Sequence, residues 1–439
     1  MYLFTLCIEK KSMREMSGRL MRKIGKDKAG FIKSSITLMS GSIIAQILSV
    51  CFSPIMTRLY SEAEIGQYTL VLTAVSMFGA VICLRYDMAI VPEEDESKVF
   101  AIIKLSFLLD IILSVLVGFG YSVYCSIKGT IQSLSFAGIV FWTTILLLFT
   151  GLGHILLAYN NRNKEYKLMT SVHVIREVGR DVSLSGLGLL HFGTIGLLIS
   201  QTLSVGLGLT RQSKSLRSKK VHWREIGNQE LKEVAIKHKK QPMFSVPASF
   251  FNSFSYSVLN IYVSNLYGLQ QLAYYSMSFR MLGLPLALIS TNMSKVYFER
   301  ASREYEQTGE FRKTFLMTTG LLGAIAIPMV VILFFLAPFL FGVFFGAPWR
   351  ASGEYVRILA PMFGIRLVVS ALSPTMTIIQ KQNWDLYIQI LFLLASSATY
   401  FLCGGGKGIE TFLVLVSVMY SVVYIVYYIY MFLHTRKKV

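Results

Sequence analysis

The sequence predicts an all-α membrane protein with about twelve transmembrane helices, arranged as two lobes of six. Three observations predict this class: long apolar runs, a low content of charge, and basic residues that gather on one side of those runs. Apolar residues make up 54% of the 439 residues, charged residues 15%, and the mean hydropathy is +0.55. Because the bilayer core holds no water, backbone polar groups must pair within helices or closed barrels. Continuous apolar runs such as 143–158 and 412–433 indicate helices.

Each crossing needs about 20 mostly apolar residues, so the chain is long enough for roughly a dozen. The fifth run is the least apolar, because it carries Arg176, Glu177, Arg180 and Asp181. Without this run every later loop would change sides. We expect spans at 36–57, 65–84, 99–124, 134–158, 168–190, 193–210, 242–266, 274–297, 314–337, 355–379, 385–403 and 409–432.

The distribution of Lys and Arg supports twelve spans. Nine of these residues precede the first span and ten lie in 211–241, on the same side if both termini are cytoplasmic. Only four fall in loops on the opposite side: Arg58, Lys128, Arg350 and Lys407. Cytoplasmic loops of membrane proteins carry this excess of positive charge. We therefore expect both termini in the cytoplasm.

Several other classes of protein are disfavoured. The formal charge of +19 does not indicate nucleic acid binding, because the basic residues flank spans, where anionic lipid headgroups are nearer. The longest outer loops, 125–133 and 343–354, hold no acid pair, histidine cluster or serine–histidine arrangement, which argues against an enzyme. We expect no metal and no cofactor, since the cysteines show no paired spacing and are interpreted as apolar filler: Cys7, Cys51, Cys83, Cys125 and Cys403.

One long hydrophilic segment, 211–241, divides the chain into two halves of six spans. An even number of spans in each half gives repeats of parallel topology, related by an axis along the membrane normal. The predicted order is a basic cytoplasmic tail (1–35), an N-lobe (36–210), a basic cytoplasmic linker (211–241), a C-lobe (242–433) and a short cytoplasmic tail (434–439).

A short sequence match between the two halves supports the repeat. Leu59-Tyr60 ends the first span, and Tyr68 follows eight residues after Tyr60. The seventh span ends with Leu266-Tyr267, and Tyr275 follows at the same spacing. Both sets are offset by 207 residues, although three matching positions alone are weak evidence.

Charged residues deep in the bilayer must face a cavity or a partner, because insertion of each costs about 2.5–3.5 kcal/mol. Asp110 and Arg366 each lie about 16 Å into their spans, and Arg280 lies about 9 Å into the outer half of span 8. Arg357 is half a turn from Arg366 in net rotation and is near enough to a span end to reach water. Asp110 is interpreted as the partner of an Arg from another span or as a proton-coupling site, since burial disfavours the ionised carboxylate.

Span 5 allows two interpretations. Arg176 and Arg180 share one face at i,i+4, and Glu177 and Asp181 share the neighbouring face. The set forms either a self-compensating lattice of ion pairs at the inner interface or a cation pair aimed at an anionic substrate beside a proton acceptor. Several deep cations and few deep acids favour an anionic substrate, and the planar guanidinium suits phosphate.

Four segments resemble the bacterial polysaccharide transporters, the O-antigen flippase group of the MOP flippase superfamily. They are SGSIIAQILSVCFSPIMTRLYSEAEIGQY (40–68), LRYDMAIVPEEDES (84–97), YYSMSFRMLGLPLALISTNMSKVYFERAS (274–302) and PWRASGEYVRILAPMFGIRLVVSALSPTMTIIQKQ (348–382). The resemblance implies two six-helix lobes around a central cationic cavity, as in multidrug-extrusion (MATE) transporters, and alternating access in the bacterial cytoplasmic membrane. The implied cargo is an undecaprenyl-diphosphate-linked oligosaccharide for O-antigen and lipopolysaccharide, capsule or exopolysaccharide.

The resemblance also implies residue roles and partners. Arg85, Arg280 and Arg366 fall at matching arginines, with Arg280 and Arg366 expected to contact the diphosphate or sugar. The alternative for Arg85 is a structural cap at the inner end of span 2. Asp110 and Asp181 are the expected ion-coupling residues. Expected partners are the lipid-linked oligosaccharide, membrane lipids, a polysaccharide polymerase and a chain-length regulator.

Two other functions stay open. One is a multidrug-extrusion-type antiporter of small molecules or anions, and the other is a membrane-embedded polysaccharide polymerase or glycosyltransferase. A sugar cargo needs polar and aromatic groups along its path, and a Tyr and Asn cluster within 252–275 fits that need, although aromatic belts at the membrane interface explain part of it.

Overall fold

The protein is helical throughout the residues that its computed structural model describes, which are 46, 48–131, 133–219, 223, 226–381 and 383–436. No strand occurs in these ranges. The first described helix is Leu48–Leu59. It is followed by α3 (Glu62–Phe78), α4 (Glu96–Lys128), α5 (Phe136–Arg162), α6 (Tyr166–Leu189), α7 (Gly193–Ser218), α8 (Asn228–Lys237), α9 (Val246–Pro285), α10 (Thr291–Thr308), α11 (Arg312–Phe345), α12 (Arg350–Leu372), α13 (Thr375–Ile378), α14 (Asn383–Cys403) and α15 (Ile409–Leu433).

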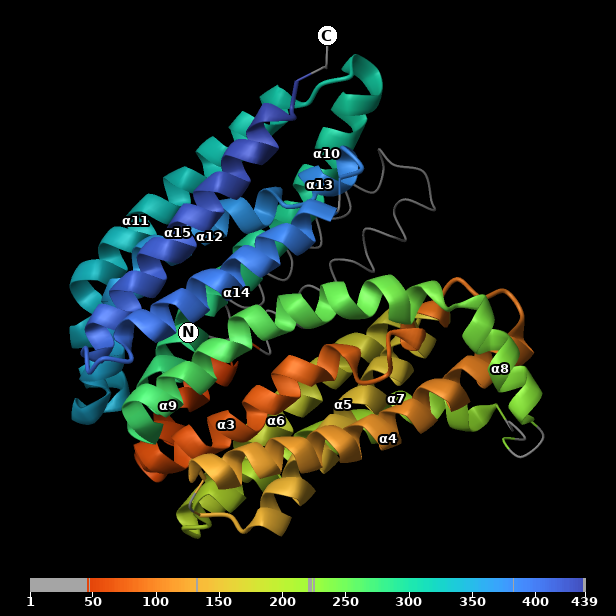
Figure 1. The fold of residues 1–439 in the computed structure, drawn as a ribbon, viewed down its shortest axis with the longest axis horizontal. Coiled ribbons are helices and arrows are strands. Elements are labelled where there is room, and N and C mark those ends of the chain that lie inside the picture. The colour runs from red at the N-terminus through yellow and green to blue at the C-terminus, as the bar shows by residue number, and fades with distance from the viewer. Residues whose placement is uncertain are drawn as a thin grey trace, which may run out of the picture.

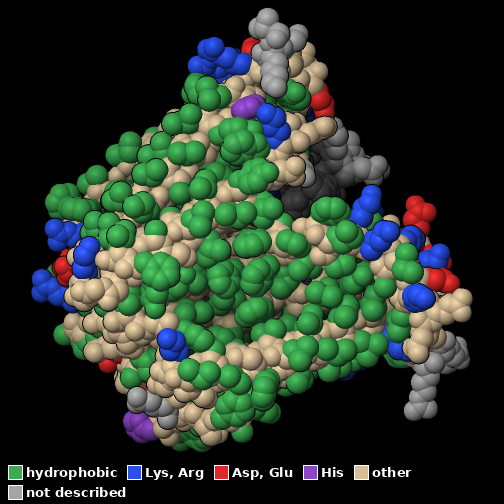
Figure 2. All heavy atoms as spheres, in the orientation of Figure 1, with side chains coloured by type: hydrophobic (Ala, Val, Ile, Leu, Met, Phe, Trp, Pro, Cys, Tyr) green, Lys and Arg blue, Asp and Glu red, His purple; other side chains and the backbone are tan. Residues whose placement is uncertain are grey.

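The predicted spans correspond to these helices. Within the described residues, nine helices are long and apolar enough to cross a membrane, and one of them, Gln241–Thr308, contains the predicted spans 7 and 8. The charged fifth span forms the 24-residue helix α6. The beginning of the predicted first span lies outside the described residues. Figure 2 shows apolar side chains covering the middle of one face, with charged side chains gathered toward its ends, as a membrane crossing requires.

Two bodies of helices meet at one end and diverge toward the other (Figure 1). One contains α3 to α8, and the other contains α10 to α15. The first helix of α9 runs along the α3 body, where Phe78 and Phe250 lie 5.7 Å apart between ring centroids. It also contacts α14, where Tyr262 stacks on Tyr400 at 4.4 Å. The predicted lobes are therefore present, and α9 packs against both.

The equivalent helices of the two halves touch at a pair of equivalent residues. The hydroxyl of Thr69 on α3 donates to the hydroxyl of Ser276 on α9 at 3.3 Å, and these positions are 207 residues apart. This offset is the one that relates Tyr60 to Tyr267 and Tyr68 to Tyr275 in the sequence. A contact between equivalent positions places the pseudo-two-fold axis between them, which supports the predicted parallel repeat.

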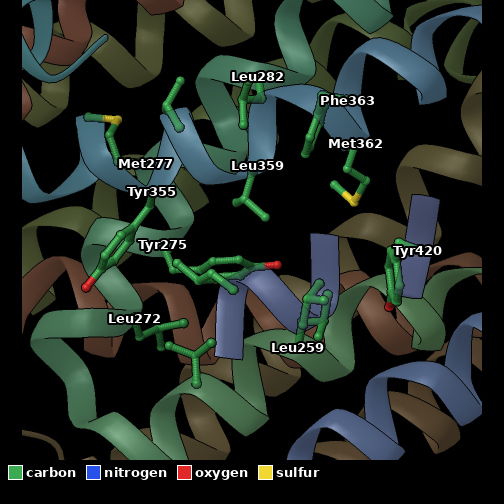
Figure 3. Close-up of a cluster of buried hydrophobic side chains, with 14 of the residues drawn as sticks. Leu259, Leu272, Tyr275, Met277, Leu282, Tyr355, Leu359, Met362, Phe363 and Tyr420 are labelled. Carbon is green, nitrogen blue, oxygen red and sulfur yellow. The ribbon is translucent and has the colours of Figure 1, made fainter. Parts of the chain in front are cut away.

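The core of the C-terminal body surrounds Tyr275 (Figure 3). Tyr275 is 2% exposed and lies among Leu259, Leu359 and Phe363, which come from α9 and α12. Aliphatic and aromatic packing of this kind fixes the second helix of α9 against α12. It therefore fixes the positions of Arg280 and Arg366, which these two helices carry.

Gly268 divides α9 into two helices. Its φ of 84° and ψ of −179° lie in a region that is essentially restricted to glycine. The turn between spans 7 and 8 therefore depends on this residue, which sequence analysis did not single out.

We expect Gly268→Ala to lower the free energy of unfolding by about 1–3 kcal/mol, because alanine is strained in this backbone conformation. Gly283→Ala is the matched control, since Gly283 lies in the same helix with open space around it and no positive φ. Thermal unfolding in detergent would measure both variants. Equal melting temperatures for the two would contradict the assignment.

The hydrophilic linker is more ordered than expected. α7 continues eight residues beyond the predicted end at 210, and α8 forms within 211–241. α8 docks on the N-lobe through Val234, which is 2% exposed, and through Ala235, whose carbonyl accepts a hydrogen bond from the Tyr86 hydroxyl at 3.2 Å. Lys104 on α4 donates to the carbonyls of Trp223 and Ile226 at 2.9 and 2.8 Å. The basic composition of 211–241 gave no indication that this segment packs against the N-lobe.

The docking also uses one buried carboxylate. Glu93, 5% exposed, accepts hydrogen bonds from Lys237 at 2.5 Å and from the ring of His238 at 3.1 Å. Arg162 at the end of α5 holds the same loop by donating to the backbone carbonyls of Glu93 and Glu94. The hydrogen bond from Lys237 lowers the pKa of the Glu93 carboxyl.

A lowered carboxyl pKa means that the docking is most stable above the ordinary Glu pKa of about 4.3 and weakens as the pH falls through the lowered value. We expect a spin label at Gln229→Cys on α8 to stay immobile at pH 7 and to gain mobility below about pH 4. With Glu93→Gln added, the label should be mobile at both pH values. An unchanged label in that variant would contradict this role for Glu93.

Candidate functional site

A cavity of about 390 Å³, which we call the central cavity, lies where the two lobes meet. The helix Leu48–Leu59, α3, α6 and α7 line it from the N-lobe, and both helices of α9 line it from the other side. Its charged residues are Arg180 and Arg280, which sequence analysis had selected. The other lining residues are Met56, Ile65, Tyr68, Thr69, Leu72, Thr73, Ser76, Gln201, Asn260, Ser276, Met277 and Phe279.

The two guanidinium groups converge on one hydroxyl. Arg180 of the N-lobe donates to the Ser49 hydroxyl at 3.2 Å, and Arg280 of α9 donates to the same oxygen. Two cations that share one neutral acceptor repel each other, and this repulsion is relieved when an anion binds between them. The cavity therefore offers an anion positively charged groups from both lobes.

Only one of these cations is neutralised by protein carboxylates. Arg180 forms ion pairs with Glu177 and, at 3.1 Å, with Asp181. Arg280 has no carboxylate within ion-pair distance in the described part of the chain. Arg280 thus has no direct ion pair among these residues, and Glu177 and Asp181 act on it only at longer range.

Both interpretations of span 5 describe part of what is present. The ion-pair lattice of Arg180, Glu177 and Asp181 is there, but it does not lie at the inner interface. Arg180 is about 21 Å along α6 from Tyr166, which is past the middle of the helix. The same arginine also lines the cavity, as the substrate-binding interpretation expected.

Polar groups that sequence analysis missed complete the cavity. The Tyr68 hydroxyl donates to Gln201 at 3.1 Å, and the Asn260 amide donates to the Thr73 hydroxyl at 3.0 Å. Asn260 belonged to the Tyr and Asn cluster noted in the sequence. Gln201 and Ser49 gave no signal, because single polar residues in an apolar span are common.

Arg366 lies beside the cavity and not among its lining residues. Its guanidinium stacks over the rings of Tyr256 at 4.5 Å, Phe363 at 5.3 Å and Phe279 at 5.7 Å. Phe279 lines the cavity, so Arg366 is separated from it by one aromatic ring. Arg357 points elsewhere, toward Phe334 and Glu354, as the half-turn offset predicted.

Two other selected arginines lie outside the cavity. Arg85 has a φ of 61° and donates to the carbonyl of Ala80 at 3.5 Å, which fits the structural cap at the end of span 2. The aliphatic part of Arg176 packs against Gly208 on α7, where a Cβ would leave no room for it. Neither side chain lines the central cavity.

Asp110 has no cationic partner among the described residues, where the interpretation that paired it with an Arg from another span is wrong. Its side chain is 0% exposed and fits against Gly151 on α5, where a Cβ would overlap the carboxyl group. One oxygen accepts from Ser114 at 3.1 Å, and the other has no hydrogen-bond partner in the described part of the chain.

Comparison with known proteins identifies the family. The family described as "Polysaccharide biosynthesis protein" matches residues 55–354. The chain belongs to this family. The matched region includes all the residues that line the central cavity. Ser49, to which Arg180 donates, lies before it in the sequence. No curated protein sequence matches the chain.

Solved structures with the same fold are transporters of the MOP superfamily. An inward-facing multidrug resistance MATE family transporter matches with a TM-score of 0.72 and 15% identity, covering 88% of this chain and 93% of that one. The lipid II flippase MurJ in an inward closed conformation matches with a TM-score of 0.70 and 15% identity, covering 91% and 87%. An outward-facing MATE family transporter gives a TM-score of 0.57 at 14% identity, covering 91% and 94%. This polysaccharide biosynthesis family member therefore has the MOP transporter fold.

The described residues of this family member contain no cluster of three His, Cys, Asp or Glu side chains that could hold a metal ion. The chemistry of its cavity is charge recognition by two guanidinium groups with hydroxyl and amide groups around them. These groups complement a phosphate or carboxylate together with a hydroxylated group.

Proposed function

We propose that this protein is a flippase that moves an undecaprenyl-diphosphate-linked oligosaccharide from the inner to the outer leaflet of the bacterial cytoplasmic membrane. The observation that carries the proposal is the guanidinium of Arg280, which forms no ion pair in the described residues and lies beside Arg180 in the central cavity. Guanidinium forks bind the oxygens of a diphosphate through two parallel hydrogen bonds. The family description and the fold shared with a lipid II flippase support a lipid-linked glycan as the cargo.

The arrangement of the lobes supports alternating access with the cavity reached from the cytoplasm. The bodies diverge toward the side that carries α8, and α8 lies in the basic linker that the charge distribution assigns to the cytoplasm (Figure 1). The inward-facing transporter also fits better than the outward-facing one, with TM-scores of 0.72 and 0.57. In this mechanism the cargo enters the central cavity from the cytoplasmic side. It leaves on the opposite side after the two lobes rotate about the contact between them.

The proposal is tested in vesicles that contain the purified protein and lipid-linked oligosaccharide extracted from the source membranes. We expect the oligosaccharide to become accessible to an enzyme or lectin on the opposite leaflet, at a rate well above that of protein-free vesicles. No acceleration would overturn the proposal. Export of organic cations or anions in its place would favour the multidrug-extrusion alternative, which shares the fold.

Asp110 is proposed as the proton-coupling residue because its carboxyl group is fully buried and forms no ion pair within the described residues. Asp110→Asn keeps the volume of the side chain and removes its titration. We expect this variant to transport at the same rate with and without an imposed proton gradient, while the wild type is accelerated by the gradient. Ser114→Ala, which removes the side-chain hydrogen bond from Ser114 to Asp110, should retain the response. A full gradient response in Asp110→Asn would exclude this role.

A further inference from the structure

A second cavity, of about 900 Å³, lies in the C-lobe between the first helix of α9 and helices α12, α14 and α15. We define it as the C-lobe pocket. Its volume falls within the range of about 300–1,000 Å³ that is usual for ligand sites. None of the residues that line it was selected as a site residue.

The lining of the C-lobe pocket differs in kind from that of the central cavity. Among the described residues, six aromatic rings, three side-chain amides and five Ser or Thr hydroxyls line it, with one carboxylate and no Lys or Arg. A pocket without cations does not hold a diphosphate, and a single carboxylate in this volume is not a chelating site. Aromatic faces with amides and a carboxylate complement a sugar, which has apolar C–H faces and hydroxyl groups that both donate and accept.

Several of these polar groups are oriented and still have hydrogen-bonding capacity to spare. The carbonyl oxygen of the Gln389 side chain accepts from Ser255 at 2.9 Å, and Asp385 accepts from the Tyr427 hydroxyl. Within the described residues, the Gln389 amide nitrogen and the Asn252 side chain have no hydrogen-bond partner. Groups held in place by one bond and open at another are preorganised for a ligand.

A row of three side chains lies between the C-lobe pocket and the central cavity. Tyr256 lines the pocket and hydrogen-bonds to Tyr424 at 3.1 Å. Arg366 stacks on Tyr256 and lies 5.7 Å from the ring of Phe279, which lines the central cavity. This row of side chains separates the two cavities, so the C-lobe pocket lies near the sugars of a cargo whose diphosphate occupies the central cavity.

We propose that the C-lobe pocket binds the neutral sugar portion of the cargo, while Arg180 and Arg280 hold its diphosphate. This inference rests on the proposed flippase function and adds the site that recognises the glycan. Specificity for the sugar then resides in the C-lobe, on Asn252, Asp385 and Gln389. The arginines of the central cavity then serve for any diphosphate-linked cargo.

The test measures equilibrium binding to the full chain in detergent with two probes. One is the free oligosaccharide released by mild acid from lipid-linked oligosaccharide of the source membranes, and the other is sugar-free undecaprenyl diphosphate. We expect Asn252→Ala combined with Gln389→Ala to weaken binding of the oligosaccharide at least about tenfold, the loss of one or two hydrogen bonds, and to leave undecaprenyl diphosphate binding unchanged. Arg280→Ala should give the opposite pattern. Gln307→Ala, an exposed amide on α10, is the control and should change neither.

Each result decides between the two proposals. Equal oligosaccharide affinity in the wild type and the pocket variant, or no binding of the oligosaccharide by the wild type, overturns the sugar pocket and leaves the flippase proposal standing. Weaker undecaprenyl diphosphate binding in the pocket variant would assign the pocket to the lipid and also overturn it. If undecaprenyl diphosphate does not bind the wild type, the proposed function fails, whatever the pocket does.

Discussion

Arg280→Ala is expected to reduce transport of the lipid-linked oligosaccharide by about 10- to 100-fold. The variant loses one charge-assisted hydrogen-bonded contact to the diphosphate, worth about 1.5–3 kcal/mol, and each 1.4 kcal/mol is a factor of ten. Arg280 gives a cleaner test than Arg180, because it leaves no carboxylate without a partner. Removal of Arg180 would strand Glu177 and Asp181, and a buried charge that loses its partner costs about 3–5 kcal/mol in stability.

Two further variants make the Arg280 result specific. Arg280→Lys keeps the charge but not the planar fork, so we expect it to recover part of the rate. Arg303→Ala removes an arginine that pairs with Glu299 on the exposed face of α10, and it should transport as the wild type does. Initial rates in reconstituted vesicles measure all three. A normal rate for Arg280→Ala would refute the role of a cationic cavity.

Gly66→Ala is expected to disrupt the contact between the lobes. A Cβ at Gly66 would come closer to the carbonyl oxygen of Leu269 than the 3.0 Å that real Cβ atoms keep. Leu269 belongs to the turn that begins the second helix of α9, so the clash is with backbone and cannot be relieved by a side-chain rotation. Overpacking of this kind costs about 1–3 kcal/mol, and here it pushes the two lobes apart.

The separation can be measured across the neighbouring contact. Thr69→Cys with Ser276→Cys, in a chain without its native cysteines, should form a disulfide readily, since the hydroxyls lie 3.3 Å apart. Adding Gly66→Ala should lower the cross-linking yield and the rate of transport. Gly120→Ala, at an open position on α4, should change neither. If the yield with Gly66→Ala stays high, the lobes do not depend on this close approach.

The sequence was most informative where bilayer physics leaves few choices. Apolar runs and the distribution of Lys and Arg predicted the helices and the division into halves, because backbone groups in lipid must pair locally. The cost of a deep charge selected Arg280 and Arg366, and only Arg280 lines the central cavity, because depth in a span does not specify which side of the helix faces the cavity. The shared face on span 5 selected Arg176 and Arg180, of which Arg180 lines it. Arg85, which the family resemblance selected, lies elsewhere.

The remaining features depend on contacts between distant segments. One interpretation paired Asp110 with an arginine, but Gly151 on α5 makes room for its carboxyl group, which accepts a hydrogen bond from Ser114. The docking of α8 needs Glu93, which is 144 residues from Lys237, and no local pattern reports such a pairing. Gly268 lies in an apolar stretch whose hydropathy does not reveal the backbone conformation that its turn requires.

The hydrogen bond between Thr69 and Ser276 bears on the origin of the fold. Two identical six-helix units that pair about a two-fold axis place the residue nearest the axis against its own copy. Thr69 and Ser276 occupy such a position in the two halves of this chain. One polypeptide therefore reproduces, at this contact, the geometry of a symmetric dimer.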